Sequence, residues 1–294
     1  MFPKYIFTSD PTDARVAAKY VPDCITLFPV LPNPDAIYES FMNHLTDLKK
    51  VYESLMDEES KKTFRGYWLG SISQNFNELV YANTQHYILE GFIPKRDDIF
   101  IDVGACYGDT ASYFSEMGYK VYAFEMDKKN FEKAKLVAEE KHFVLENFGL
   151  GSYKHEMRYT PQGGMSRFNP NGTEIAKITT LDAYVRENDL PRVDFIKFDV
   201  EGAELDVLQG ATSTIARDKP ILAISAYHKW NDFWTLMNFV KSIRSDYEFA
   251  MRQYRSSLED LPPSDQNIQL ENFLYSLGLD VKVCWYNECV LFAR

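Results

Sequence analysis

The stretch FIDVGACYGDT, Phe100–Thr110, decides the fold class of this 294-residue chain. Its first half is a short apolar run of the kind that forms a buried strand, and its second half carries two glycines where a helix would begin. A turn of this kind presents backbone N–H groups and the positive end of a helix dipole to a ligand, and glycine lets that ligand approach the backbone. The stretch therefore predicts a ligand-binding turn between a strand and a helix.

The glycine turn differs from the fingerprint of nicotinamide dinucleotides. That fingerprint, G-x-G-x-x-G, needs a middle glycine against the pyrophosphate, whereas Gly104 and Gly108 have none between them and Asp102 precedes the first. An acidic group there suits an ammonium, as in the methionine part of S-adenosylmethionine. Glu125 lies 21 positions after Gly104, close to the spacing of about 20 at which an acid accepts the ribose hydroxyls. The pattern favours an adenosine cofactor with a cationic amino-acid end.

The rest of the chain from Ile99 onward alternates apolar runs with amphipathic stretches, in the rhythm of βαβ units. We predict a doubly wound, mostly parallel sheet with helices on its faces and an antiparallel last strand at its edge. The strands are expected at 99–103, 120–126, 142–148, 193–200, 220–226, 247–254 and 288–294. The helices are expected at 110–118, 129–141, 181–188, 203–218 and 232–243, with Thr180 capping the third.

The first 90 residues differ from the rest of the chain in sequence pattern, because clustered prolines are followed by helical periodicity. We predict a mainly helical accessory segment at 1–90 and a catalytic-type α/β domain at 91–294, with an insertion at about 256–279. The accessory segment could shape a substrate pocket or mediate formation of a homo-oligomer, and the sequence leaves both open.

Composition and charge narrow the classes of partner. The formal net charge of −11 means that the average surface repels phosphate backbones and anionic lipid, so we expect no nucleic-acid partner. A small molecule or a glycan fits better. No run approaches the roughly 20 apolar residues that span a bilayer, and the first residues lack the features of a signal peptide. We therefore expect a cytoplasmic protein whose cysteines are free thiols.

A second motif, IKFDVEGAELDVLQGA, occupies Ile196–Ala211. Its acidic cluster follows a buried strand, at the sheet edge where open α/β folds bind ligands. Asp199 and Glu201 are therefore expected to point toward the same crevice as Gly104, whereas Glu204 reads as a first-turn residue favoured by the helix dipole. The alternative is that Asp199 and Glu201 only cap the following helix.

At this point the sequence resembles the FkbM-type family of S-adenosylmethionine-dependent methyltransferases. The resemblance rests on a lysine, an aspartate and Glu-Gly-x-Glu ahead of a Val-Leu-x-Gly-Ala helix, and on TTLD and FAMRQY elsewhere, and it covers about 99–254 and 288–294. It implies a class I (Rossmann-like) methyltransferase fold and O-methylation of a hydroxyl on a sugar, glycan or glycosylated metabolite.

The resemblance also implies roles for individual residues. Glu125 would hold the ribose, Asn147 would lie near the adenine and Asp199 would face the reaction centre. The methionine part of the cofactor would be lined by Asp102, Gly104 and Gly108, with Asp109 and Thr110 close behind. Ala105 is also expected to bind the cofactor. One departure concerns the fifth strand, where Ser225 stands in place of the acidic residue that the family often has ahead of its histidine.

Two routes for activating the acceptor remain open at this stage. A hydroxyl needs a base or a divalent cation to lose its proton at neutral pH. His228 is the first candidate for the base because an unperturbed imidazole titrates near pH 6.5, although packing explains a lone histidine as well. Asp199 and Glu201 could instead hold Mg2+ through their oxygens. A nicotinamide-dependent oxidoreductase and a non-catalytic cofactor-binding scaffold are the alternative functions.

Overall fold

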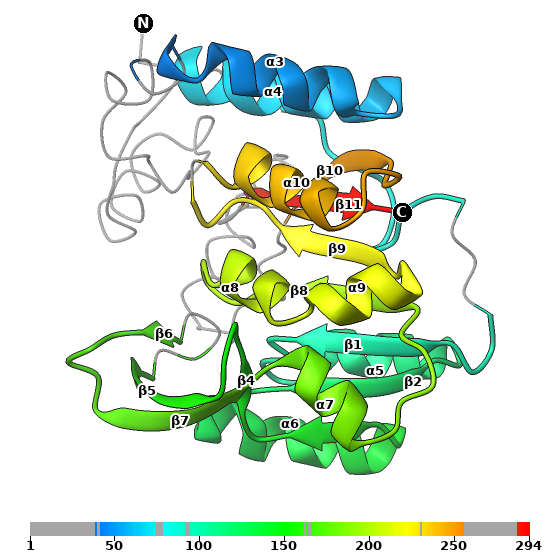
Figure 1. Ribbon diagram of the computed structural model, residues 1–294, viewed down its shortest axis with the longest axis vertical. Helices are drawn as coiled ribbons and strands as arrows, with labels where there is room; N and C mark the ends of the chain where they lie inside the picture. Colours follow the sequence, from blue (N-terminus) through cyan, green and yellow to red (C-terminus); the bar gives the residue numbers. More distant parts are fainter. Residues whose placement is uncertain are drawn as a thin grey trace, which may run out of the picture. The chain divides into compact units, whose positions relative to one another are not determined.

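The computed structural model describes residues 39, 42–73, 79–91, 95–161, 163, 166–229, 231–255 and 287–294 (Figure 1). The insertion predicted at about 256–279 lies outside these residues, as does most of 1–41. The chain divides into two compact units, the first comprising Met1–Glu53, Asp57–Asn83 and Met251–Cys289 and the second Ser54–Met56, Thr84–Ala250 and Val290–Arg294. The domain boundary near residue 90 and the accessory role of the first segment stay predictions.

A seven-stranded sheet has the order β10-β11-β9-β8-β1-β2-β3. The five strands from β9 to β3 run parallel, and β11 is antiparallel to β9. This arrangement confirms the predicted mostly parallel sheet and its antiparallel last strand. The strand bounds are β1 Ile99–Val103, β2 Lys120–Phe124, β3 Val144–Glu146, β8 Phe195–Phe198, β9 Ile221–Ser225, β10 Phe249–Arg255 and β11 Asn287–Ala293.

The prediction that the last strand forms the edge of the sheet is wrong. Strand β11 lies between β9 and β10, so β10 is the edge. The residues from Cys289 to Ala293 are all fully buried, which an exposed sheet edge would not allow. The chain therefore reaches β10 first and then returns to fill the gap beside β9.

The helices of the sheet domain form two groups. Helix α5, Asp109–Glu116, packs against α6, Lys128–Lys141, whereas α7, α8, α9 and α10 pack among themselves. The two groups cover opposite faces of the sheet (Figure 1), as a doubly wound fold requires. Helix α7 spans Leu181–Glu187 and α10 spans Asp232–Ile243. The predicted cap is confirmed, since the Ala183 N–H donates to Thr180 Oγ1 over 3.0 Å.

The single helix predicted at 203–218 is two helices. Helix α8 spans Glu204–Gln209 and α9 spans Thr212–Asp218. Gly210 lies between them, and a Cβ atom there would lie 1.9 Å from the carbonyl oxygen of Gly151. The absence of a side chain lets another part of the backbone approach α8 at its end.

Gly151 follows the first strand of a second sheet that the sequence analysis did not predict. Its order is β4-β7-β5-β6, with β4 Gly149–Leu150, β5 His155–Thr160, β6 Arg167–Phe168 and β7 Glu174–Thr179. Tyr159, Ala176 and Ile178 form its small core, with Met126 and Met157 packed against them. The sheet is therefore attached to the main domain next to the end of β2.

The first unit contains α3, Leu45–Ser54, and α4, Glu58–Ser73, where helical periodicity was predicted. Buried Arg252 forms ion pairs with Asp57 and Glu59 at the start of α4 and donates to Ser60 Oγ over 2.8 Å. No helix within the described ranges is long and apolar enough to cross a membrane.

Candidate active site

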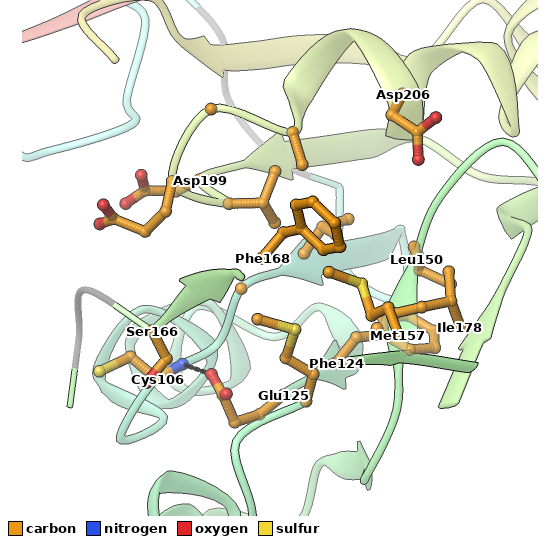
Figure 2. Close-up of a pocket in the computed structure, with 18 of the residues that line it drawn as sticks. Cys106, Phe124, Glu125, Leu150, Met157, Ser166, Phe168, Ile178, Asp199 and Asp206 are labelled. Carbon is orange, nitrogen blue, oxygen red and sulfur yellow. Dashed lines mark hydrogen bonds between the residues drawn. The ribbon is translucent and has the colours of Figure 1, made fainter. Parts of the chain in front are cut away.

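A cavity of about 520 Å³ opens at the carboxyl ends of β1, β2 and β8. Asp199 lies on one side of it, and apolar side chains of the second sheet such as Leu150 and Ile178 lie on the other (Figure 2). The volume lies within the roughly 300–1,000 Å³ of sites for small molecules and cofactors. The cavity therefore has the place, size and mixed lining of a ligand site.

The glycine turn forms one wall of this cavity. Gly104 has a φ of +87°, and a Cβ there would lie 1.9 Å from the backbone oxygen of Asp199. The N–H groups of Gly104 and Ala105 both donate to the carbonyl oxygen of Phe124 over 3.0 Å. The turn thus joins the ends of β1, β2 and β8, and only glycine fits at its first position.

Glu125 sits at the base of the cavity (Figure 2). Its side chain accepts hydrogen bonds from the backbone N–H groups of Cys106 at 2.8 Å and Asp127 at 2.6 Å. Burial raises the pKa of this carboxyl to about 7, although both hydrogen bonds favour its ionised form. Glu125 therefore offers a fixed acceptor whose charge changes near neutral pH.

Asp102 is completely buried, and its Oδ1 lies 2.9 Å from Lys197 Nζ. Lys197 also donates to the carbonyl oxygen of Gly104 over 2.7 Å. Burial alone lowers the pKa of Lys197, but the charges of Asp102 and Asp199 outweigh it and hold that pKa above its ordinary value. Asp102 is not among the residues that line the cavity, so the geometry gives it the role of balancing Lys197 beneath the turn. Its contact with a cofactor stays a prediction.

The other residues predicted to bind the cofactor lie around this turn rather than in the cavity lining. Gly108, with a φ of +88°, precedes α5 as its N-cap, and Asn147 donates to the carbonyl oxygen of Glu125 over 2.9 Å. Asn147 and Asp109 are exposed. Of the predicted set, Gly104, Glu125 and Asp199 line the cavity, whereas Asp102, Ala105, Gly108, Asp109, Thr110 and Asn147 do not. Their roles in binding stay predictions.

The apolar wall was missed by the sequence reasoning. Met126 follows β2, and Leu150, Met157 and Ile178 belong to the second sheet. Phe168 also lines the cavity while its side chain remains largely exposed, at 61%. The alternation of apolar and polar residues in MRYT and EIAKIT was the available signal.

The loop at 161–172 contributes Gly163 and Ser166 to the cavity. Ser166 Oγ donates to Asp127 Oδ2 over 2.6 Å, and Asn130 Nδ2 donates to the carbonyl oxygen of Gly163 over 2.9 Å. Both partners belong to the start of α6, next to Glu125. The described part of the loop is therefore attached beside the base of the cavity.

An acidic cluster lies at the other end of the cavity. Asp199 and Glu201 line it, and buried Glu204 lies behind them in the first turn of α8. Glu201 has a φ of +53°, a left-handed conformation that costs a residue with a side chain about 1–2 kcal/mol. Such strain is concentrated at functional sites. The structure thus brings Asp199 and Glu201 to the same crevice as Gly104, as predicted.

His228 lies within this cluster but does not line the cavity. Its Nδ1 is 2.8 Å from Glu204 Oε1, and its Nε2 is 3.6 Å from Asp199 Oδ1 and 3.8 Å from Glu201 Oε1. Burial lowers its pKa, but the hydrogen bond to Glu204 and the three carboxylates outweigh burial and raise that pKa to about 9. The carboxylate that the sequence seemed to lack at Ser225 is supplied by Glu204.

The aromatic residues near His228 are divided between the core and less buried positions. Phe233 is fully buried and Trp234 is 8% exposed, so core packing accounts for both. Trp230 lies outside the described residues. Away from this cluster, Phe168 of the second sheet is an exposed aromatic residue that lines the cavity.

Comparison with known proteins gives matches of two kinds. The chain is 27% identical over 127 residues to the hexuronic acid methyltransferase AglP of Haloferax volcanii, which is 41% of this chain and 53% of that protein. The crystal structure of methyltransferase FkbM from Methylobacillus flagellatus KT superimposes with a TM-score of 0.64 at 19% identity, covering 87% of this chain and 60% of that one. This chain thus spans little more than half the length of either.

The structural likeness confirms the predicted class I methyltransferase fold. The family model described as the methyltransferase FkbM domain matches residues 102–258. The match begins at Asp102 before the glycine turn and includes the whole acidic cluster. It covers more than half of the 294 residues, and the chain therefore belongs to the family of FkbM methyltransferase domains.

Proposed function

We propose that the protein is an S-adenosylmethionine-dependent O-methyltransferase acting on a hydroxyl of a sugar, glycan or glycosylated metabolite. The observation that carries this proposal is the cavity with Glu125 at one end, Asp199 at the other and the Gly104 turn between them. Family membership supports the chemistry. The name of the Haloferax relative, a hexuronic acid methyltransferase, supports a sugar as the acceptor.

The cofactor would lie along the wall formed by the turn. Glu125 would accept the ribose hydroxyls, and Gly104 would let the methionine part approach the backbone. Leu150, Met157 and Ile178 of the second sheet would contact the adenine. Bound there, the cofactor supplies an electrophilic methyl carbon. The chain's own residues hold it in line with the acceptor oxygen and exclude water.

The acceptor would enter at the acidic cluster. Asp199 would face the acceptor oxygen, with His228 behind it. Because the pKa of His228 is raised to about 9, most of this imidazole is protonated at neutral pH and is a poor base there. The similar proteins give no support to Mg2+. The metal role of Asp199 and Glu201 stays a prediction. The cytoplasmic location and homo-oligomer formation stay predictions.

Isothermal titration with S-adenosylhomocysteine and, in parallel, NAD tests the cofactor. We expect binding of the first and none of the second. Binding of NAD alone would favour an oxidoreductase. Bound S-adenosylhomocysteine without methyl transfer to any member of a panel of sugars and glycans would favour a scaffold. Alkali-stable transfer of the methyl group separates an ether formed at a hydroxyl from an ester formed at a carboxyl.

The affinity for S-adenosylhomocysteine is expected to rise about tenfold between pH 6 and pH 8, with a midpoint near the Glu125 pKa of about 7. Only the ionised carboxylate accepts both ribose hydroxyls without carrying a proton of its own.

The stability of the unliganded protein is expected to depend on pH in the opposite direction. The folded-state pKa lies above the ordinary 4.5, so this carboxyl stabilises the fold most at low pH and this contribution falls as the pH rises through about 7.

Titration calorimetry over this pH range checks the expectation. Glu125→Gln, which keeps the shape of the side chain, should remove most of the pH dependence. An affinity that is flat from pH 6 to 8 in the wild type, or an unchanged slope in the variant, would show that Glu125 does not hold the ligand.

Phe168→Ala is expected to raise the KM for a sugar acceptor about 2- to 10-fold while leaving the affinity for S-adenosylhomocysteine unchanged. An exposed ring at a cavity can stack on the apolar face of a sugar, and aromatic contacts of this kind contribute about 0.5–1.5 kcal/mol. Phe168→Tyr keeps the ring and serves as the control. If the cofactor affinity falls instead of the acceptor affinity, the ring belongs to the cofactor side.

A further inference from the structure

The acidic cluster around His228 has the composition of a metal site. Asp199, Glu204 and His228 each offer one ligand atom, and these atoms lie within 4.8 Å of one another. The three residues come from the end of β8, the first turn of α8 and the segment after β9. The sheet topology therefore brings together donors that are separated in the sequence.

Two atoms of this cluster that are able to bind a metal ion are buried and have no hydrogen bond among the described residues. They are Glu204 Oε2 and His228 Nε2, and their side chains are only 1% and 8% exposed. Nε2 points between the oxygens of Asp199 and Glu201. A buried polar atom without a partner is costly, and a cation bound between Asp199 and Glu201 would give Nε2 a partner.

The surrounding hydrogen bonds hold the ligands in place. Glu204 Oε1 lies 2.8 Å from His228 Nδ1 and accepts the N–H groups of Val200 at 3.1 Å and Gly202 at 3.3 Å. Tyr87 donates its hydroxyl to Asp199 Oδ2 over 2.8 Å. A carboxylate on one ring nitrogen fixes the imidazole so that its other nitrogen faces the ion, as at many metal centres.

The geometry points to a binding site for one divalent transition-metal ion, such as Mn2+ or Zn2+, held by His228 Nε2, Asp199 and Glu201, with Glu204 fixing the imidazole from behind through Nδ1. An imidazole with two carboxylates suits these ions, whereas Mg2+ prefers an all-oxygen shell. Three protein ligands leave coordination positions open, which is typical of catalytic rather than structural centres. This ligand set adds His228 to Asp199 and Glu201, the two carboxylates that were predicted to hold Mg2+, and the imidazole favours a different ion.

The open positions would face the cavity, because Asp199 lines it. This catalytic part rests on the proposed function, whereas metal binding by itself does not. A hydroxyl bound to the ion becomes more acidic. Its oxygen forms the bond to the methyl carbon, the sulfonium sulfur keeps the electron pair of the broken S–C bond, and the hydroxyl proton passes to water. His228 would then bind the ion and would not have to act as the base, so the protonation of the free imidazole would not limit the reaction.

Metal binding is tested on the full chain after removal of metals with EDTA. Mn2+ is titrated and followed by electron paramagnetic resonance, and Co2+ is followed by its visible absorption. We expect one ion per chain and a Co2+ spectrum that changes when the histidine ligand is lost. His228→Gln and Asp199→Asn should each weaken binding more than about tenfold.

Asp206→Asn is the matched control, since Asp206 lines the same cavity but bonds to Ser152 outside the cluster. It should bind both ions as the wild type does. The site is refuted if the wild type binds neither Mn2+ nor Co2+, or if folded His228→Gln and Asp199→Asn variants bind them unchanged. A parallel titration with S-adenosylhomocysteine separates the two proposals: bound metal without bound cofactor would refute only the proposed function, and the reverse only the metal site.

Discussion

Lys197→Met is expected to lower the free energy of unfolding by about 3–5 kcal/mol. The substitution keeps an unbranched side chain, one atom shorter, but removes the charge that balances Asp102, whose side chain is completely buried. It also removes the hydrogen bond to the carbonyl oxygen of Gly104. A carboxylate left alone in such a place must take up a proton or remain uncompensated. Chemical denaturation of the variant and the wild type measures the loss.

The double variant Asp102→Leu/Lys197→Met tests whether the stability of the fold depends on the ion pair itself or only on leaving no unpaired charge buried. Replacing both members of a buried ion pair with apolar groups is often neutral, so we expect the double variant to regain much of the lost stability. Full recovery is not expected, because Lys197 also faces Asp199 and bonds to the turn. A single variant that loses less than about 1 kcal/mol would contradict this account of the ion pair.

Gly104→Ala is expected to destabilise the protein by about 2–5 kcal/mol and to abolish measurable binding of S-adenosylhomocysteine. A methyl group there meets the backbone oxygen of Asp199 at 1.9 Å, and backbone cannot rotate away as a side chain can. The end of β8 would have to move, and with it the acidic end of the cavity. Denaturation and calorimetry measure the two effects separately.

Gly91→Ala is the matched control for this steric effect. Gly91 has a φ of +85°, close to that of Gly104, but a Cβ there meets nothing within 4 Å. The free energy of unfolding of this variant should therefore fall only by the cost of the left-handed conformation, about 1–2 kcal/mol. Its affinity for the ligand should be unchanged. Equal losses in the two variants would mean that conformation alone, and not the close approach to Asp199, makes glycine necessary at 104.

The sequence predicted the parts of the fold that depend on local pattern. Hydrophobic runs located the parallel strands, and Thr180 marked the start of α7 because a capping hydroxyl acts within three residues. Glu125 was found from its spacing to Gly104, since the carboxyl ends of parallel strands meet at the same edge of a sheet. These features need no knowledge of distant contacts.

The remaining features depend on contacts between distant parts of the chain. Glu204 was predicted to be a helix-dipole residue, because nothing in its neighbourhood reveals that His228, 24 positions later, bonds to it. Strand β11 was placed at the edge because its order in the chain does not give its order in the sheet. The second sheet has short strands with polar exposed faces, so its signal was weak and the apolar wall of the cavity was missed.

Helix α8 has a consequence for how the two halves of the site communicate. Within its six residues, Glu204 holds His228 at the acidic end, whereas Asp206 holds Ser152 beside the apolar wall. A short rigid helix cannot shift at one of these residues without shifting at the other. If binding of the proposed cofactor moves the second sheet, the movement would reach the groups proposed to meet the acceptor. The two ligands would then be thermodynamically linked, and each would change the affinity for the other by the same factor.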